Sequence, residues 1–128
     1  MLFNDVVYYL PDKDIDLIEY QEKVIIISPF DNLIINRKRL KKIFDLDYRL
    51  DCYLPVSKRK FGFFSMPLLY HDQFIGLIDL KADRTTGTLL VKNLHYLIKS
   101  DPYIKKLLDI ALEEFAGFND CVNIKFEN

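Results

Sequence analysis

Two runs of basic residues lie in the middle of the chain, and the second leads into aromatic side chains. The first run spans six residues, of which five are basic: Arg37, Lys38, Arg39, Lys41 and Lys42. The second consists of Lys58, Arg59 and Lys60, and Phe61-Gly62-Phe63-Phe64 follow directly. Basic side chains bind phosphates, and aromatic rings stack or wedge against bases. This pattern makes nucleic-acid binding one candidate. Composition alone favours the alternative, a solvated helix face beside a hairpin whose phenylalanines belong to the core.

The distribution of charge supports the nucleic-acid interpretation. The whole chain has a net charge of −1, but residues 36–60 carry a net charge of +6. Residues 1–35 carry −5 and residues 61–128 carry −2. The basic middle is therefore balanced by distant acidic flanks rather than by its own neighbours, and we expect one face of the molecule to be positive.

The residue types that bind metals are too scattered to indicate a metal or cofactor site. His71 and His95 are far apart in sequence, and neither has a second histidine or a cysteine within one helical turn. Cys52 and Cys121 form no Cys-x-x-Cys pattern, so a disulfide framework is not expected and a reducing cytoplasm fits best. We expect no cofactor.

The catalytic patterns that a sequence can reveal are equally weak. Asp79 and Asp83 would lie roughly 13 Å apart along a strand, beyond the usual separation of paired catalytic carboxylates. The chain has no nucleophile elbow and no glycine-rich phosphate loop. We therefore expect no complete catalytic centre in this chain.

Two amphipathic helices are predicted. Asn36 is a suitable N-cap for a basic helix from Arg37 to Phe44. A second helix begins at Ser100-Asp101-Pro102, and Gly117 is the expected left-handed C-cap. Its apolar residues fall on one face of a helix: Ile104, Leu107, Leu108, Ala111, Leu112 and Phe115. A short acidic helix around Ile15 and Ile18 is also expected.

The remaining pattern is that of strands. The predicted strands are Met1–Tyr9, Val24–Ile27, Tyr48–Leu54, Phe61–Tyr70, Phe74–Lys81, Thr88–Leu97 and Val122–Phe126. Short turns between the three long candidates predict an antiparallel meander. The expected fold is a single α+β domain over residues 1–128, with a meander-like antiparallel sheet of about five to six strands. No apolar run reaches the roughly 18 residues that a membrane span needs.

A series of ordered motifs between about Tyr9 and Leu97 resembles one known family. The motifs are Ser28-Pro29-Phe30-Asp31, Asn36–Phe44, Asp47-Tyr48-Arg49, Tyr53-Leu54-Pro55, Lys58–Phe63, Pro67-Leu68-Leu69 and Asp79–Arg84. They resemble the C-terminal part of the YcaQ-like winged-helix proteins, the crosslink-repair DNA glycosylases. The resemblance implies a function in DNA repair, in which a β-rich region helps to form the DNA-binding surface.

The same resemblance implies that catalysis takes place elsewhere. In the family a glutamine-based motif of the N-terminal winged-helix region is catalytic, whereas Gln21 and Gln73 here stand alone, outside any Gln-x-Gln pattern. The chain is expected to begin after that region, as an excised domain, a natural truncation or one half of a two-chain enzyme.

Three functions remain open at this stage. The first is a non-catalytic DNA-binding domain whose lysines and arginines contact the phosphates of a duplex. Carried over from the family, its basic hairpin falls on Lys58, Arg59, Lys60 and Phe61, and its strand-end motif on Lys81, Asp83 and Arg84. The second is half of a glycosylase that needs an N-terminal winged-helix partner chain. The third is a structural or protein-interaction domain that forms a homodimer.

Overall fold

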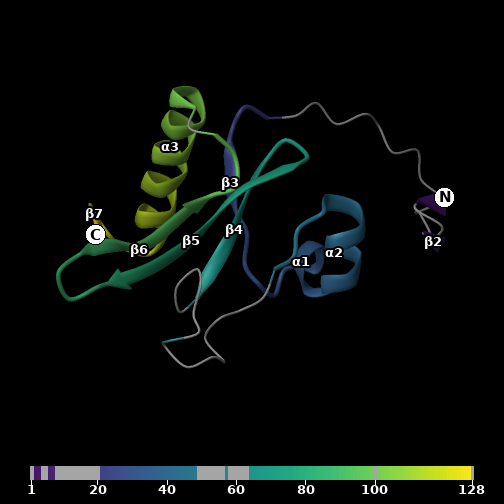
Figure 1. Cartoon of the computed structure of the whole chain (residues 1–128). Helices are drawn as coiled ribbons and strands as arrows, with labels where there is room; N and C mark the ends of the chain where they lie inside the picture. The colour runs from purple at the N-terminus through teal and green to yellow at the C-terminus, as the bar shows by residue number, and fades with distance from the viewer. Residues whose placement is uncertain are drawn as a thin grey trace.

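A computed structural model describes residues 21–48, 57, 64–99 and 101–127, together with two short strands near the N-terminus. Its centre is a five-stranded sheet in the order β3-β4-β5-β6-β7 (Figure 1). The strands are β3 (Val24–Ile26), β4 (Ser65–Tyr70), β5 (Gln73–Asp83), β6 (Thr88–Tyr96) and β7 (Asn123–Phe126). The α+β class and the predicted strand number are confirmed.

Neighbouring strands run antiparallel from β3 to β6, but β7 runs parallel to β6. The meander β4-β5-β6 was predicted, and it is confirmed. A parallel return needs a long crossover connection, and α3 (Pro102–Phe118) provides it between β6 and β7. The predicted antiparallel, meander-like sheet is therefore confirmed from β3 to β6, and β7 departs from it as a parallel strand.

One face of the sheet packs against α3. The buried residues of the helix are those of the predicted apolar stripe together with Ala116, except that Phe115 is only partly buried. They contact buried side chains of the sheet, including Leu68 of β4, Ile78 of β5 and Val91 of β6. The helix begins as predicted, because the Asp101 side chain accepts a hydrogen bond from the Tyr103 amide. This face holds the larger apolar core.

The opposite face is partly covered by two short helices, α1 (Asn32–Ile35) and α2 (Arg37–Phe44). Figure 1 shows α3 and the α1–α2 pair on opposite sides of the sheet. Ile34 of α1 and Leu40 of α2 are buried with Phe74 and Leu77 of β5 in a second, smaller core. The sequence predicted α2 with its Asn36 cap, but it did not predict α1.

Three further sequence predictions need correction or lie outside the described residues. Gly117 is not a C-cap, because α3 continues to Phe118 and the left-handed residue is Asp120. The opening strand is instead two short antiparallel strands, β1 (Leu2–Phe3) and β2 (Val6–Val7). The predicted acidic helix, and the strand from Tyr48 to Leu54 apart from Tyr48 itself, lie outside the described residues. Among the described helices, none is both long and apolar enough to cross a membrane.

Candidate nucleic-acid interface

The basic helix α2 is held at both ends by capping interactions. At its start, the Asn36 side chain accepts a hydrogen bond of 3.0 Å from the Arg39 amide. At its end, Asp45 adopts a left-handed conformation with φ 53°, and its amide bonds to the Lys41 carbonyl. Leu40, 1% exposed, anchors the helix in the smaller core. The predicted cationic element therefore forms a defined helix on the surface.

Arg37 is committed to the protein itself. Its guanidinium donates hydrogen bonds to the carbonyl oxygens of Pro29, at 3.2 Å, and of Ile34, at 2.5 Å. It also lies 4.6 Å from the centroid of the Tyr48 ring, a cation–π contact. These contacts hold the first turn of α2 against Pro29, Ile34 and Tyr48.

Arg39 has a similar structural contact, because its guanidinium donates to the carbonyl oxygen of Asn32 in α1. The two arginines of α2 therefore join the helix to its surroundings through hydrogen bonds to backbone carbonyl oxygens.

The three lysines of α2 differ from the arginines because all three are exposed. Lys38, Lys41 and Lys42 are separated by three and four positions, the spacing of neighbours on one helix face. Lys41 pairs with Asp45 at 2.8 Å, and this hydrogen bond raises the pKa of Lys41 and lowers the pKa of Asp45. The exposed positive charge of α2 is thus concentrated on one face.

One strand-end residue of the predicted site, Lys81, lies on the same side of the sheet as α2. Leu80 and Ala82 of β5 pack on the α3 side, so alternation directs Lys81 to the opposite side. Lys81 is exposed, and Arg84 is exposed in the turn between β5 and β6. The Asp83 side chain stays in this turn, accepting hydrogen bonds from the amide and the hydroxyl of Thr85.

Lys81 also lines a pocket of about 320 Å³, together with Phe64, Asp79, Leu80 and Lys92. Sequence reasoning missed Lys92 of β6. The register between β5 and β6 shifts by one residue: Asp79 pairs with Asn93, but Leu80 pairs with Val91. Lys92 is the extra residue of this β-bulge, and it lines the same pocket as Lys81. The sequence could not predict this position, because it depends on the register between two strands and not on the residues next to Lys92.

The second basic run, Lys58, Arg59 and Lys60 with Phe61, lies outside the described residues. The segment belongs to the stretch of chain between Tyr48 and Ser65. The Tyr48 hydroxyl donates a buried hydrogen bond of 2.5 Å to the Ser65 carbonyl. These two end residues are therefore joined beside the smaller core, which includes Tyr48.

A polar cluster that the sequence did not suggest lies at another edge of the sheet. One Glu22 carboxylate oxygen accepts hydrogen bonds from the hydroxyls of Tyr70, at 2.8 Å, and of Tyr103, at 2.7 Å. The other lies 2.7 Å from Nε2 of His71. These bonds, chiefly that of Tyr103, lower the pKa of Glu22, and the bond to Glu22 raises the pKa of Tyr70 to about 12. The cluster ties α3 to β4.

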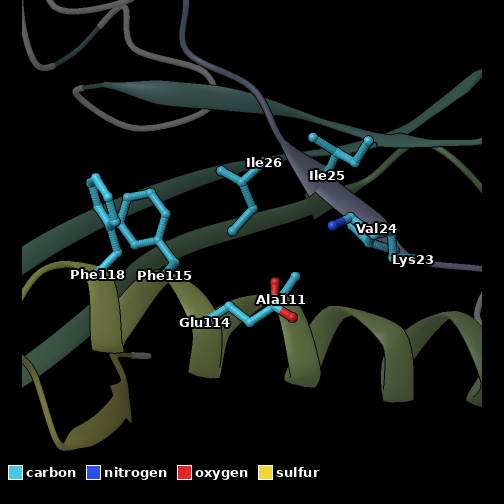
Figure 2. Close-up of a pocket in the computed structure, with 8 residues that line it drawn as sticks. All are labelled: Lys23, Val24, Ile25, Ile26, Ala111, Glu114, Phe115 and Phe118. Atoms are coloured by element: carbon cyan, nitrogen blue, oxygen red, sulfur yellow. The ribbon is translucent and has the colours of Figure 1, made fainter. Parts of the chain in front are cut away.

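An apolar groove of about 280 Å³ lies between β3 and α3, on the side opposite α2 (Figure 2). Figure 2 shows Phe115 and Phe118 at one end of the groove, and Lys23 and Val24 at the other. Phe118 is 89% exposed, an unusual state for a large apolar side chain. On its outer side β3 has no strand partner among the described residues.

Within the described ranges, no group of three or more His, Cys, Asp or Glu side chains could hold a metal ion.

Comparison with known proteins gives one family match. The family model described as "DNA glycosylase AlkZ-like" matches residues 4–118. This match confirms the resemblance to the YcaQ-like proteins, which are the same family, over nearly the whole chain. No solved structure matches the chain.

Proposed function

The chain belongs to the AlkZ-like family of DNA glycosylases, and on that premise we propose that it is a non-catalytic DNA-binding domain of a repair protein. In this proposal its basic residues contact the phosphate backbone of duplex DNA. Catalysis would come from a winged-helix region of the same family, because neither Gln21 nor Gln73 belongs to a Gln-x-Gln motif.

The observation that supports the proposal is that the arginines and the lysines of α2 have different contacts. Arg37 and Arg39 hold the helix in place through carbonyl oxygens, while Lys38, Lys41 and Lys42 extend from its exposed side. Lysine ammonium groups on a fixed helix are suited to phosphate contacts that do not depend on base sequence. Shape and charge, rather than base readout, would then determine binding.

The test is fluorescence anisotropy of a short labelled duplex across a salt series. We expect the affinity of the 128-residue chain to fall steeply as salt rises, because each phosphate contact releases a counterion. The triple variant Lys38→Ala, Lys41→Ala, Lys42→Ala should bind more weakly, with a salt slope smaller by about 3. A second triple variant, of Lys58, Arg59 and Lys60, tests the other basic run in the same way.

The matched control removes three exposed lysines that lie outside the proposed surface: Lys99, Lys105 and Lys106. This control changes the net charge by the same amount, so its salt slope should stay close to that of the unmodified chain. Equal losses in the control and the α2 variant would show that only net charge matters. Binding that appears only when a winged-helix chain is added would favour the half-enzyme alternative, and base excision by that mixture would support it further.

The groove between β3 and α3 favours a second candidate function, homodimerisation. A second copy is the occupant we propose, because Lys23 and Glu114 place opposite charges on the same groove and are both exposed. Two copies related by a two-fold axis could pair these charges while covering Phe118. The backbone of β3 would also gain a strand partner.

Light scattering after size-exclusion chromatography tests this second candidate over a range of concentrations. Phe118→Lys should shift the protein towards the monomer. Phe126→Lys is the matched control, since Phe126 is also exposed but lies on β7, outside the groove. A monomer at all concentrations, or an equal effect of both variants, would remove the dimer from consideration.

A further inference from the structure

Three lysines that are distant in sequence are brought together on the sheet face opposite α3. Lys81 of β5 pairs with Leu90 of β6, and Leu90 pairs in turn with Lys125 of β7. Neighbouring strands lie about 4.8 Å apart, so the Cα atoms of Lys81 and Lys125 are separated by roughly 10 Å. Lys92 lies two positions beyond Leu90, at the bulge.

The packing of β6 and β7 shows to which side these residues point. Leu89 and Val91 are buried in the core under α3, and Ile124 packs against the same core. Alternation along each strand therefore directs Leu90 and Lys125 to the opposite side, where Lys81 also points. We call Lys81, Lys92 and Lys125 the sheet lysines.

All three sheet lysines are exposed. A nearby carboxylate is that of Asp79, which is 4% exposed and lines the same pocket as Lys81 and Lys92. The Asp83 carboxylate is engaged by Thr85 in the turn. Glu127, just beyond β7, is exposed. The ion pairs Lys41–Asp45 and Glu22–His71 involve none of the sheet lysines.

We infer that the sheet lysines form a second line of contact with the phosphate backbone of the duplex that α2 binds. This inference rests on the proposed function and extends it to β5, β6 and β7. The packing of their neighbours places both sets of lysines on the side of the sheet opposite α3, where Figure 1 shows α2. The inference is that one duplex contacts both sets.

The experiment compares four forms of the chain on the same labelled duplex across a salt series. These are the unmodified chain, the α2 triple variant, the Lys99, Lys105 and Lys106 control, and the variant Lys81→Ala, Lys92→Ala, Lys125→Ala. We expect the sheet-lysine variant to lose affinity and to have a salt slope smaller by about 3, while the control keeps both. The variant with arginine at the three sheet positions should retain binding, because the charges remain.

The outcomes separate this inference from the proposed function. If the α2 variant loses binding but the sheet-lysine variant matches the control, the inference is wrong and the proposed function stands. If the unmodified chain does not bind the duplex even at low salt, both fail. If the sheet lysines matter for anionic phospholipid vesicles and not for the duplex, the partner is a membrane surface and the inference is overturned. Circular dichroism of each variant confirms that it is folded.

Discussion

The two faces of the sheet are built from the same strands, yet they differ in chemistry. The α3 side is continuously apolar, and α3 buries six side chains there. The other side has a smaller apolar core, where α1 and α2 cover Phe74 and Leu77, and further along it presents Lys81. Alternation along β5 thus directs apolar side chains such as Ile78 and Leu80 to the α3 side and the charged side chain of Lys81 to the opposite side. Stability and binding should therefore respond to different substitutions.

The largest effect should come from the α3 side. Leu108, 1% exposed, lies in the centre of the larger core, and Leu108→Ala should lower the free energy of unfolding by about 2–5 kcal/mol. Urea denaturation measures the loss. Ile110→Ala, on the exposed side of the same helix, is the control and should change stability by only about 0.5 kcal/mol. Where Leu108→Ala remains folded, its salt slope for DNA should be unchanged. A changed slope would contradict the separation of the two faces.

A smaller loss is expected on the α2 side. Tyr48→Phe keeps the buried ring but removes the hydroxyl that bonds to the Ser65 carbonyl. The buried acceptor then loses this donor, which should cost about 1–3 kcal/mol in urea denaturation. Because this bond fastens both ends of the segment that carries Lys58–Lys60, DNA affinity should fall as well. A loss of stability without any change in DNA affinity would indicate that the segment with Lys58–Lys60 does not contribute to DNA binding.

The cap of α2 should contribute still less. Asn36→Ala removes the acceptor for the Arg39 amide, and N-cap losses of this kind cost about 1 kcal/mol. Asn36→Asp should retain the stability, because aspartate caps a helix equally well. Thermal unfolding of the two variants measures the difference. Equal destabilisation by alanine and aspartate would indicate that the amide group of Asn36 has another role.

The smallest effect should be the pH dependence of the Glu22 cluster, at the edge where α3 meets β4. The bond to Glu22 raises the pKa of Tyr70 from 10.0 to about 12, so its contribution is complete below pH 10 and is lost as pH rises towards 12. The pKa of Glu22 is lowered from 4.5, so its contribution is present above pH 4.5 and is lost as pH falls through the lowered value.

Urea denaturation of the unmodified chain and of Glu22→Ala at a series of pH values tests this. The difference in stability between the two should shrink as pH falls below 4.5 and as it rises above 10. A difference that does not vary with pH would show that the cluster acts through packing alone.

Much of the fold was predictable because its signals are local. The stripe from Ile104 to Phe115 and the cap at Asn36 depend on spacings within one or two helical turns, and both predictions are confirmed. The end of α3 was not predictable from Gly117. The helix stops where the Cys121 amide bonds to the Ala116 carbonyl and the Asn119 side chain bonds to the Phe115 carbonyl. A glycine near a helix end permits such a stop but does not require it.

The sequence by itself determined which segments are basic, which helix faces are apolar and that the three long strands form a meander. The tertiary structure alone decided that Arg37 and Arg39 act as braces while their lysine neighbours stay exposed. It also decided that Lys81, Lys92 and Lys125 share one face. The physical reason is the distance along the chain over which each feature is determined. Side-chain periodicity depends on residues a few positions apart. The shared face of the three lysines depends instead on the β5–β6 bulge and on the parallel pairing of β7, which follows α3, with β6.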